Sequence, residues 1–286
     1  MSWQMSSGVT ARNNVQVSGP EDGPVLVFAH GFGTDQTMWH KVLPWFTDRY
    51  RVVLLDHVGS GGSDQSAYDS DTYSKLDAYV DDLLEVCAEL GLEDATLIGH
   101  SVGSMMAVSA AVRDESHRFG RLVLVTASPS YLDHPEDSYA GGFSRRDIDD
   151  VFESLDANYV VWAESMAPVY MNTPHAPDLD HEIQGSFGRI SPRVARDFAR
   201  VAFLSDVRHL LADVTVPVLV LQSSDDVVTP DHVGTYLYAK LPDATLVRLA
   251  ATGHFPQSSA PEETAAARGR QRRSSGPAAG GRRRCG

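Results

Sequence analysis

Cysteine is almost absent from this 286-residue sequence, which contains only Cys87 and Cys285. Two cysteines cannot form a disulfide framework, and they do not have the spacing of a thiolate zinc site. Cys87 falls within a helical pattern, so we expect a small buried apolar residue there rather than a functional thiol. The cysteine count therefore excludes a disulfide-stabilised scaffold.

Long apolar runs are also missing. No stretch of the sequence approaches the roughly 18 consecutive apolar residues that a membrane-spanning helix needs. The first residues, MSWQMSSGVTARNN, have no apolar segment of the kind found in secretory signals. We therefore expect a soluble, cytoplasmic protein without a membrane partner.

Basic residues are scarce in most of the chain. Lys and Arg number 24 against 38 Asp and Glu, and seven of the arginines lie within residues 267–286, where there is no acid. Residues 1–266 thus carry a formal charge of −21, which makes nucleic acid a poor partner because the phosphate-neutralising charge is missing. Residues 267–286 lack any apolar period, so we expect a disordered basic tail.

Short β-rich runs alternate with helical stretches along the chain. Most of these runs are apolar on both faces, as in strands buried within a parallel sheet. They cover residues 25–29, 52–55, 96–99, 122–126, 216–222 and 245–249, and residues 10–18 are expected to add an antiparallel edge. The stretch 73–90 has apolar positions at helical spacing and is followed by Gly91 as a C-cap. The pattern predicts the α/β class, with a mostly parallel sheet flanked by helices.

The alternation stops between about residues 133 and 205. Helical patterns at 147–163 and 192–204 occur there without a convincing strand. A segment of that length is too long for a plain connection and indicates an insertion. We therefore expect a core made of residues 1–132 and 206–266, with a helical cap at residues 133–205.

The clearest chemical signal is the sequence GHSVG at residues 99–103, which matches the G-x-S-x-G nucleophile elbow. It follows a predicted strand and precedes a helix-compatible run, as the motif requires. The turn lifts the Ser101 hydroxyl above the sheet and places the Val102 amide at a helix N-terminus, where a negative oxygen is stabilised. A second amide donor is expected from Phe32, in the HGFG sequence after the first predicted strand.

A serine nucleophile needs a base, because its hydroxyl reacts weakly near neutral pH. Of the eleven histidines, His254 follows the last predicted strand, where a loop can overhang the elbow. His30 begins the HGFG sequence and is expected to hold that loop by hydrogen bonding. His100 lies within the elbow and is expected to pack.

The imidazole in turn needs an acid that fixes its tautomer. Asp225 and Asp226 follow the predicted strand at 216–222, and one of them is expected to face the histidine. Asp56 is a competitor, but its glycine-rich setting favours a role in organising a loop. The chain order serine, aspartate, histidine is the order found in α/β-hydrolases.

Cofactor motifs are absent. The glycine-rich run at residues 59–62 has neither the P-loop pattern nor the dinucleotide-binding spacing, and no clustered His/Asp pattern suggests a metal site. We therefore expect an enzyme that needs no cofactor and no metal.

Eight segments together resemble the RsbQ-like branch of the α/β-hydrolases, bacterial activators of the general-stress sigma factor. They are similar, more distantly, to the plant karrikin and strigolactone receptors. The segments are AHGFGTDQTMW, LLDHVGSGGSD, IGHSVGSM, ASPSYL, GGF, FLSDVRHLL, VPVLVLQSSDD and ATGHFPQ, and the resemblance covers about residues 18–263. It implies a hydrolase core under a helical cap, with a mostly apolar pocket between them.

The resemblance also implies residue roles and a partner. It makes Ser101 the nucleophile, Asp226 rather than Asp225 the acid, and His254 the base. The Phe32 and Val102 amides match the oxyanion pair. A PAS-domain phosphatase is the implied protein partner. The side chains implied to line the substrate pocket are Phe32, Tyr131, Phe143, Trp162 and Phe203.

The sequence thus predicts a serine hydrolase of a small hydrophobic ester- or lactone-like compound that is a positive regulator of a stress-response sigma factor. Two alternatives stay open: a general carboxylesterase or cofactor-free haloperoxidase-like enzyme without a signalling role, and a ligand receptor with slow incidental hydrolysis. One departure from the family stands out. The helix that opens at Pro261 runs into arginines where an apolar stripe is expected.

Overall fold

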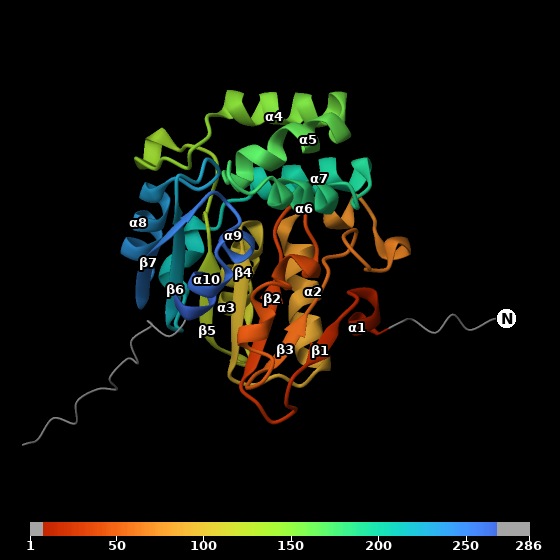
Figure 1. Cartoon of the computed structure of the whole chain (residues 1–286). Coiled ribbons are helices and arrows are strands. Elements are labelled where there is room, and N and C mark those ends of the chain that lie inside the picture. The colour runs from red at the N-terminus through yellow and green to blue at the C-terminus, as the bar shows by residue number, and fades with distance from the viewer. Residues whose placement is uncertain (1–7, 268–286) are drawn as a thin grey trace, which may run out of the picture.

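A twisted seven-stranded sheet forms the centre of the molecule in the computed structural model, which describes residues 8–267 (Figure 1). Its spatial order is β1-β3-β2-β4-β5-β6-β7, and all neighbouring strands are parallel except β1 and β3. The strands are β1 (Gln16–Ser18), β2 (Val25–Ala29), β3 (Arg51–Leu54), β4 (Ala95–His100), β5 (Phe119–Val125), β6 (Val218–Ser224) and β7 (Ala244–Thr252). The predicted α/β class and the antiparallel edge are confirmed.

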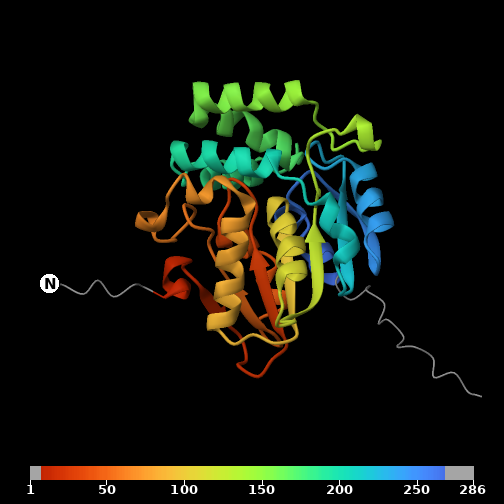
Figure 2. The same cartoon turned by 180° about the vertical axis from the view of Figure 1, so that it is seen from behind.

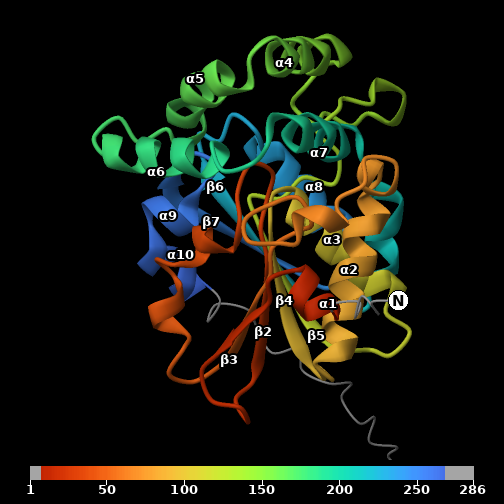
Figure 3. The ribbon, with the colours of Figure 1, turned by 90° about the vertical axis from the view of Figure 1, so that its right-hand side faces the viewer.

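Helices cover both faces of this sheet, which is why its central strands are apolar on both sides. Every residue of β4 is buried. One face carries α2 (Leu76–Glu89), α3 (Val102–Arg113) and α8 (Asp231–Lys240), as Figures 2 and 3 show. The opposite face carries α9 (Pro256–Ser259) and α10 (Pro261–Ala267). Cys87 is fully buried in α2, and burial raises the pKa of its thiol to about 12, as expected of a structural cysteine.

The N-terminal edge segment and the start of the first long helix differ from the prediction. Residues 9–12 form the short helix α1 (Val9–Arg12), so only the second half of the expected edge segment pairs with β3. Helix α2 begins at Leu76, because Tyr73 has non-helical backbone angles. The 3-10 segments of the described residues are η1 (Gln36–Trp39), η2 (Leu43–Trp45), η3 (Gln65–Ala67), η4 (Thr72–Ser74), η5 (Pro135–Asp137) and η6 (Arg208–Asp213).

Four helices lie together above the carboxyl ends of the strands, as Figures 1 and 3 show. The helical pattern predicted at 147–163 is split, because the Asn158 backbone is extended and its side chain accepts hydrogen bonds from the first amides of the next helix. The helix at residues 177–187 was not predicted, and its sequence contains a glycine and few apolar residues. The four are α4 (Arg145–Ala157), α5 (Tyr159–Met171), α6 (Pro177–Phe187) and α7 (Pro192–Leu204).

The last described helix, α10, is short but well attached. Its Thr264 and Ala265 side chains are buried, and the Glu263 carboxylate accepts hydrogen bonds from the amides of Ala250 and Ala251 at 2.8 and 3.1 Å. These bonds fasten α10 to strand β7. The tail predicted at residues 267–286 lies outside the described residues, apart from Ala267. Within residues 8–267, no helix combines the length and the apolar character needed to cross a membrane.

Candidate active site

Ser101 occupies a strained turn between β4 and α3. Its φ and ψ are 55° and −125°, a conformation that side chains rarely adopt. A Cβ atom on Gly99 would lie 2.3 Å from the Gly103 carbonyl oxygen, and one on Gly103 would lie 2.6 Å from the carbonyl oxygens of Ala29 and His30. Both motif positions therefore exclude side chains, and the turn presents the serine hydroxyl above the sheet.

Three predicted side chains meet above this turn. The Ser101 Oγ lies 2.9 Å from His254 Nε2, and His254 Nδ1 lies 2.8 Å from Asp226 Oδ2. The Asp226 carboxylate can only accept a hydrogen bond, so the imidazole hydrogen is on Nδ1. Nε2 is therefore left to accept the serine hydroxyl hydrogen. The loops after β4, β6 and β7 thus bring together a hydroxyl, an imidazole and a carboxylate in line.

The Asp226 carboxylate is held from several sides. It accepts hydrogen bonds from the Val228 amide at 2.8 Å, the Thr229 amide at 3.1 Å and the Thr229 hydroxyl at 2.9 Å. Its side chain is completely buried. The neighbouring Asp225 is exposed and has a φ of 49°, so the chain turns there and the two carboxylates point to different surroundings.

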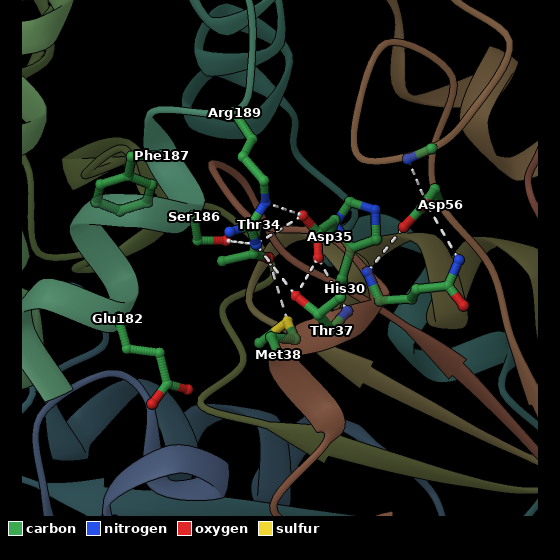
Figure 4. Close-up of polar contacts among 12 residues, drawn as sticks. His30, Thr34, Asp35, Thr37, Met38, Asp56, Glu182, Ser186, Phe187 and Arg189 are labelled. Atoms are coloured by element: carbon green, nitrogen blue, oxygen red, sulfur yellow. Dashed lines mark hydrogen bonds and ion pairs between the residues drawn. The ribbon is translucent and has the colours of Figure 1, made fainter.

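Asp56 and His30 organise loops instead. The Asp56 carboxylate accepts from the Gln36 amide and the Gly62 amide, each at 2.8 Å, in the network that Figure 4 shows beside His30. His30 Nδ1 donates to the Gly31 carbonyl, and His30 Nε2 accepts from the His57 amide. The expected loop-holding role of both side chains agrees with these bonds.

The loop that carries Phe32 runs directly against the elbow. A Cβ atom on Gly31 would lie 3.0 Å from the Ser101 Cβ, so only glycine allows this approach. Among the residues that the structure describes, none accepts a hydrogen bond from the Phe32 or the Val102 amide. Val102 is also the first residue of α3, where the helix dipole favours negative charge. Both amides are therefore available to an anionic oxygen above Ser101.

A narrow, mostly apolar pocket opens above the serine. Phe32, Tyr131 and Phe203 line it, but two of the five aromatics expected there lie behind the lining. The Phe143 ring packs 5.6 Å from Phe203, and the Trp162 ring packs 5.9 Å from Phe32. The other residues that line the pocket are Ser101, Tyr170, Phe187, Ala202, Val228, His254 and Phe255.

Tyr170 and Phe187 are lining residues that the sequence reading missed. The buried positions of α5 include Tyr159, Trp162, Ala163, Ala167 and Tyr170, which recur at helical spacing. Extending the predicted helix by two turns would have placed Tyr170 on the buried face. Phe187 ends α6, the helix without a prediction, so no comparable signal existed for it.

Tyr131 touches the nucleophile directly. Its hydroxyl lies 2.9 Å from the Ser101 Oγ, and the side chain is 1% exposed. Burial raises the pKa of Tyr131, so the phenol stays protonated near neutral pH and donates to the serine oxygen. A substrate carbonyl that approaches Ser101 must replace this contact.

The last turn of α5 is bonded to both loops that carry the acid and the base. The His254 amide donates to the Tyr170 carbonyl at 2.7 Å, and the Thr252 hydroxyl donates to the Asn172 carbonyl at 2.9 Å. The Asn172 side chain donates to the Asp225 carbonyl at 3.1 Å. The position of this cap helix therefore helps to set the positions of the histidine and aspartate loops.

Three buried histidines lie near the elbow: His30, His57 and His100. His100 Nε2 donates to the His254 carbonyl at 2.8 Å, which adds a second anchor for that loop. Burial lowers the pKa of all three imidazoles, and it lowers those of His57 and His100 most strongly. All three are therefore neutral near pH 7.

These neutral histidines predict a pH-dependent stability. As the pH falls below about 6.5, the unfolded chain binds protons that the folded protein excludes. The free energy of unfolding therefore decreases, by about 1.4 kcal/mol per pH unit for each histidine that stays neutral. Urea unfolding across this pH range measures the slope.

A matched pair of variants tests the assignment. His57→Gln removes one buried imidazole, so its unfolding free energy should fall less steeply with decreasing pH. His175→Gln, at a histidine that is exposed to solvent, is the matched control for the removal of one imidazole. Equal slopes in both variants and the parent protein would refute a contribution from His57.

An ion pair joins the cap to the loop that carries Phe32. Figure 4 shows Arg189, from the segment between α6 and α7, reaching Asp35, with Thr37 and Ser186 beside the same guanidinium. The Arg189 Nε lies 2.8 Å from Asp35 Oδ2. Burial acts to raise the pKa of Asp35, but hydrogen bonds from Arg189 and Thr37 outweigh it and the pKa lies below its usual value. Phe187, two residues before the arginine, reaches the pocket.

We expect Arg189→Met to raise KM for ester substrates about fivefold, with a smaller change in kcat. The variant keeps the apolar stem but releases the Phe187 wall of the pocket, and a loss of about 1 kcal/mol corresponds to about that factor. Lys41→Met is the control. Lys41 pairs with Glu182 of α6 and so also joins the cap to the core, but it does not contact the loop that carries Asp35. Steady-state kinetics of both variants make the comparison, and an equal rise in KM would contradict a specific role for Arg189.

One group of potential metal ligands occurs among the described residues. His134, Glu136 and Asp137 place ligand atoms within 4.8 Å of one another. Both carboxylates are exposed, and Asp137 is already paired with Arg208 at 3.1 Å. The group lies outside the pocket lining and has no role in the chemistry above Ser101.

Comparison with known proteins agrees with this geometry. The family model described as alpha/beta hydrolase fold matches residues 24–261. A strigolactone esterase of Arabidopsis thaliana is 39% identical over 253 residues, which cover 88% of this chain and 93% of the relative. A karrikin insensitive 2 receptor of Petunia hybrida is 36% identical over 240 residues, which cover 84% and 86%. A solved hydrolase from Oleispira antarctica superposes with a TM-score of 0.86 at 35% identity and covers 90% and 93% of the two chains.

Proposed function

The chain belongs to the α/β-hydrolase family, and from that premise we propose that it is a serine esterase of small hydrophobic esters or lactones. One observation carries the proposal. The Ser101 hydroxyl, the His254 imidazole and the Asp226 carboxylate are hydrogen-bonded in line at the bottom of an apolar pocket. Such a line activates a hydroxyl for acyl transfer.

The reaction follows from the positions of these groups. The Ser101 Oγ attacks the substrate carbonyl carbon while His254 Nε2 takes the hydroxyl proton. The carbonyl oxygen becomes an anion and accepts hydrogen bonds from the Phe32 and Val102 amides. When the intermediate collapses, the imidazolium gives its proton to the departing alkoxide. Water then attacks the acyl-serine by the same route and releases the acid.

Asp226 acts on the histidine rather than on the substrate. Its buried carboxylate accepts the Nδ1 hydrogen, which keeps Nε2 free for the serine proton. Its negative charge also stabilises the imidazolium that forms in both halves of the reaction. The three hydrogen bonds from Val228 and Thr229 hold the carboxylate in place for this role.

Covalent labelling tests the nucleophile independently of the natural substrate. A fluorophosphonate probe should react with the folded protein, and peptide mass spectrometry should find the label on Ser101. Hydrolysis of short p-nitrophenyl esters and of small lactones then measures turnover. Labelling at another serine, or none, would overturn the proposal.

A receptor role is the second candidate, and the likeness to the plant proteins favours it. One of those relatives is named as a receptor and another as an esterase, and this chain is similar to both. In a receptor, Ser101→Ala would keep ligand-dependent stabilisation and partner binding. Loss of the biological response in that variant would instead favour catalysis as the output.

The RsbQ-like segments of the sequence support a further part of the proposal. We propose that this hydrolase is cytoplasmic and is a positive regulator of a stress-response sigma factor that works with a PAS-domain phosphatase. Deletion of the gene should block the energy-stress response, and Ser101→Ala should fail to restore it. An unchanged response after deletion would leave a carboxylesterase without a signalling role.

A further inference from the structure

Tyr170 is fixed in the pocket by its ring and by its backbone. The ring packs edge-on against Trp162 and Phe187, with centroids 6.1 and 6.3 Å away. Its backbone carbonyl accepts the His254 amide at 2.7 Å, and the two rings lie 6.4 Å apart. The side chain therefore holds a set position relative to the base that serves Ser101.

The Tyr170 hydroxyl has no hydrogen-bond partner among residues 8–267, and Tyr170, which is 7% exposed, lines the pocket. Other buried tyrosines of this region do have partners. Tyr131 bonds to Ser101, Tyr139 donates to the Ser130 carbonyl at 2.6 Å, and Tyr159 donates to the Phe187 carbonyl at 2.8 Å. A hydroxyl that a bound substrate covers loses water as a partner, so a hydrogen-bond acceptor on the substrate would fit here.

The pocket offers such a partner a defined place. Apart from the Ser101 hydroxyl and the His254 imidazole, the only polar side-chain groups on its described lining are the hydroxyls of Tyr131 and Tyr170, and Tyr131 already contacts the serine. Burial raises the pKa of Tyr170, which keeps the phenol protonated and able to donate near neutral pH. The remaining lining is apolar, so the hydroxyl marks one polar point on an apolar wall.

We propose that Tyr170 is a specificity-determining residue that donates a hydrogen bond to a second oxygen of the substrate, away from the reacting carbonyl. The inference rests on the esterase function proposed above. It narrows the substrate class to compact esters or lactones that carry an additional ether or carbonyl oxygen. An ester of the same size with carbon in place of that second oxygen leaves the Tyr170 hydroxyl without a partner when it is bound. The site therefore discriminates against that ester.

Matched ester pairs test the proposal. The pairs of p-nitrophenyl esters are methoxyacetate with butanoate, 3-methoxypropanoate with pentanoate, and 4-oxopentanoate with 4-methylpentanoate. Each pair exchanges one acceptor oxygen for carbon, at three distances from the reacting carbonyl. The ratio of kcat/KM within a pair is compared between the parent protein and Tyr170→Phe, so that intrinsic reactivity cancels. Tyr238→Phe, at a tyrosine that is 53% exposed, is the control.

We expect the parent protein to favour the oxygenated ester of at least one pair by about tenfold more than Tyr170→Phe does. Ratios within twofold of each other in both proteins, for all three pairs, would overturn the inference, as would the same shift in Tyr238→Phe. Thermal unfolding of Tyr170→Phe checks that the variant folds. Ser101→Ala separates the two proposals: activity within tenfold of the parent protein there defeats the esterase function, whereas a loss of several orders of magnitude in Ser101→Ala together with unchanged ratios in Tyr170→Phe defeats only the role of Tyr170.

Discussion

Ser101→Ala is expected to lower kcat for p-nitrophenyl ester hydrolysis by about 10⁴-fold or more, with little effect on the thermal unfolding midpoint. The loss is large because the nucleophile, base and acid act as a unit, so removing one removes nearly all of their joint contribution. The fold should tolerate the change because alanine lacks only the hydroxyl. Stopped assays with a long observation time measure the residual rate.

The control for this variant is Ser104→Ala, one turn into α3. The Ser104 hydroxyl is buried and donates to the Gly99 carbonyl at 2.7 Å, so it supports the elbow without facing the substrate. Ser104→Ala should therefore lose some stability but keep most of its activity. Activity of Ser101→Ala within tenfold of the parent protein would show that another group is the nucleophile.

Asp226→Asn is expected to lower kcat by about 10³- to 10⁴-fold while leaving the pocket intact. An asparagine amide donates a hydrogen to His254 Nδ1, which moves the imidazole hydrogen to Nε2 and removes the acceptor for the serine proton. The amide also lacks the charge that stabilises the imidazolium.

Asp225→Asn is the matched control, since it makes the same chemical change one residue earlier. Asn tolerates the positive φ of this position, and the Asp225 side chain is exposed. Its activity should stay within a few-fold of the parent protein. Equal losses in the two variants would mean that the loop, rather than the Asp226 carboxylate, supports the histidine.

The elbow could be predicted from the sequence because its physics is local. Ser101 lies in a strained turn, and the residues two before and two after it approach neighbouring backbone too closely for a Cβ atom, so both are glycines. The strand before this turn and the helix after it have their own sequence patterns. The histidine could be found because few loops follow the last strand. Asp225 and Asp226 could not be separated by residue type alone, since the choice depends on a backbone turn at Asp225 that no pattern records.

The pocket wall was harder to predict, because it depends on how the cap helices sit. Asn158 splits one helical pattern into two, and the second of these helices carries Tyr170 to the pocket. Phe143 and Trp162 have the right residue type but pack behind other rings, since side-chain depth is set by tertiary contacts. Residue type and periodicity identify a buried aromatic, but they do not say which ring faces a cavity.

The bonds from the last turn of α5 have a consequence for any attempt to exchange the cap. The insertion does not behave as an interchangeable module, because Tyr170 and Asn172 supply contacts to Asp225, Thr252 and His254 in the core. A cap transplanted from another hydrolase would misplace the acid and base loops unless its final helical turn made the same bonds. A chimera should therefore join the two proteins before Tyr170, inside α5, so that the last turn of this helix stays with the core.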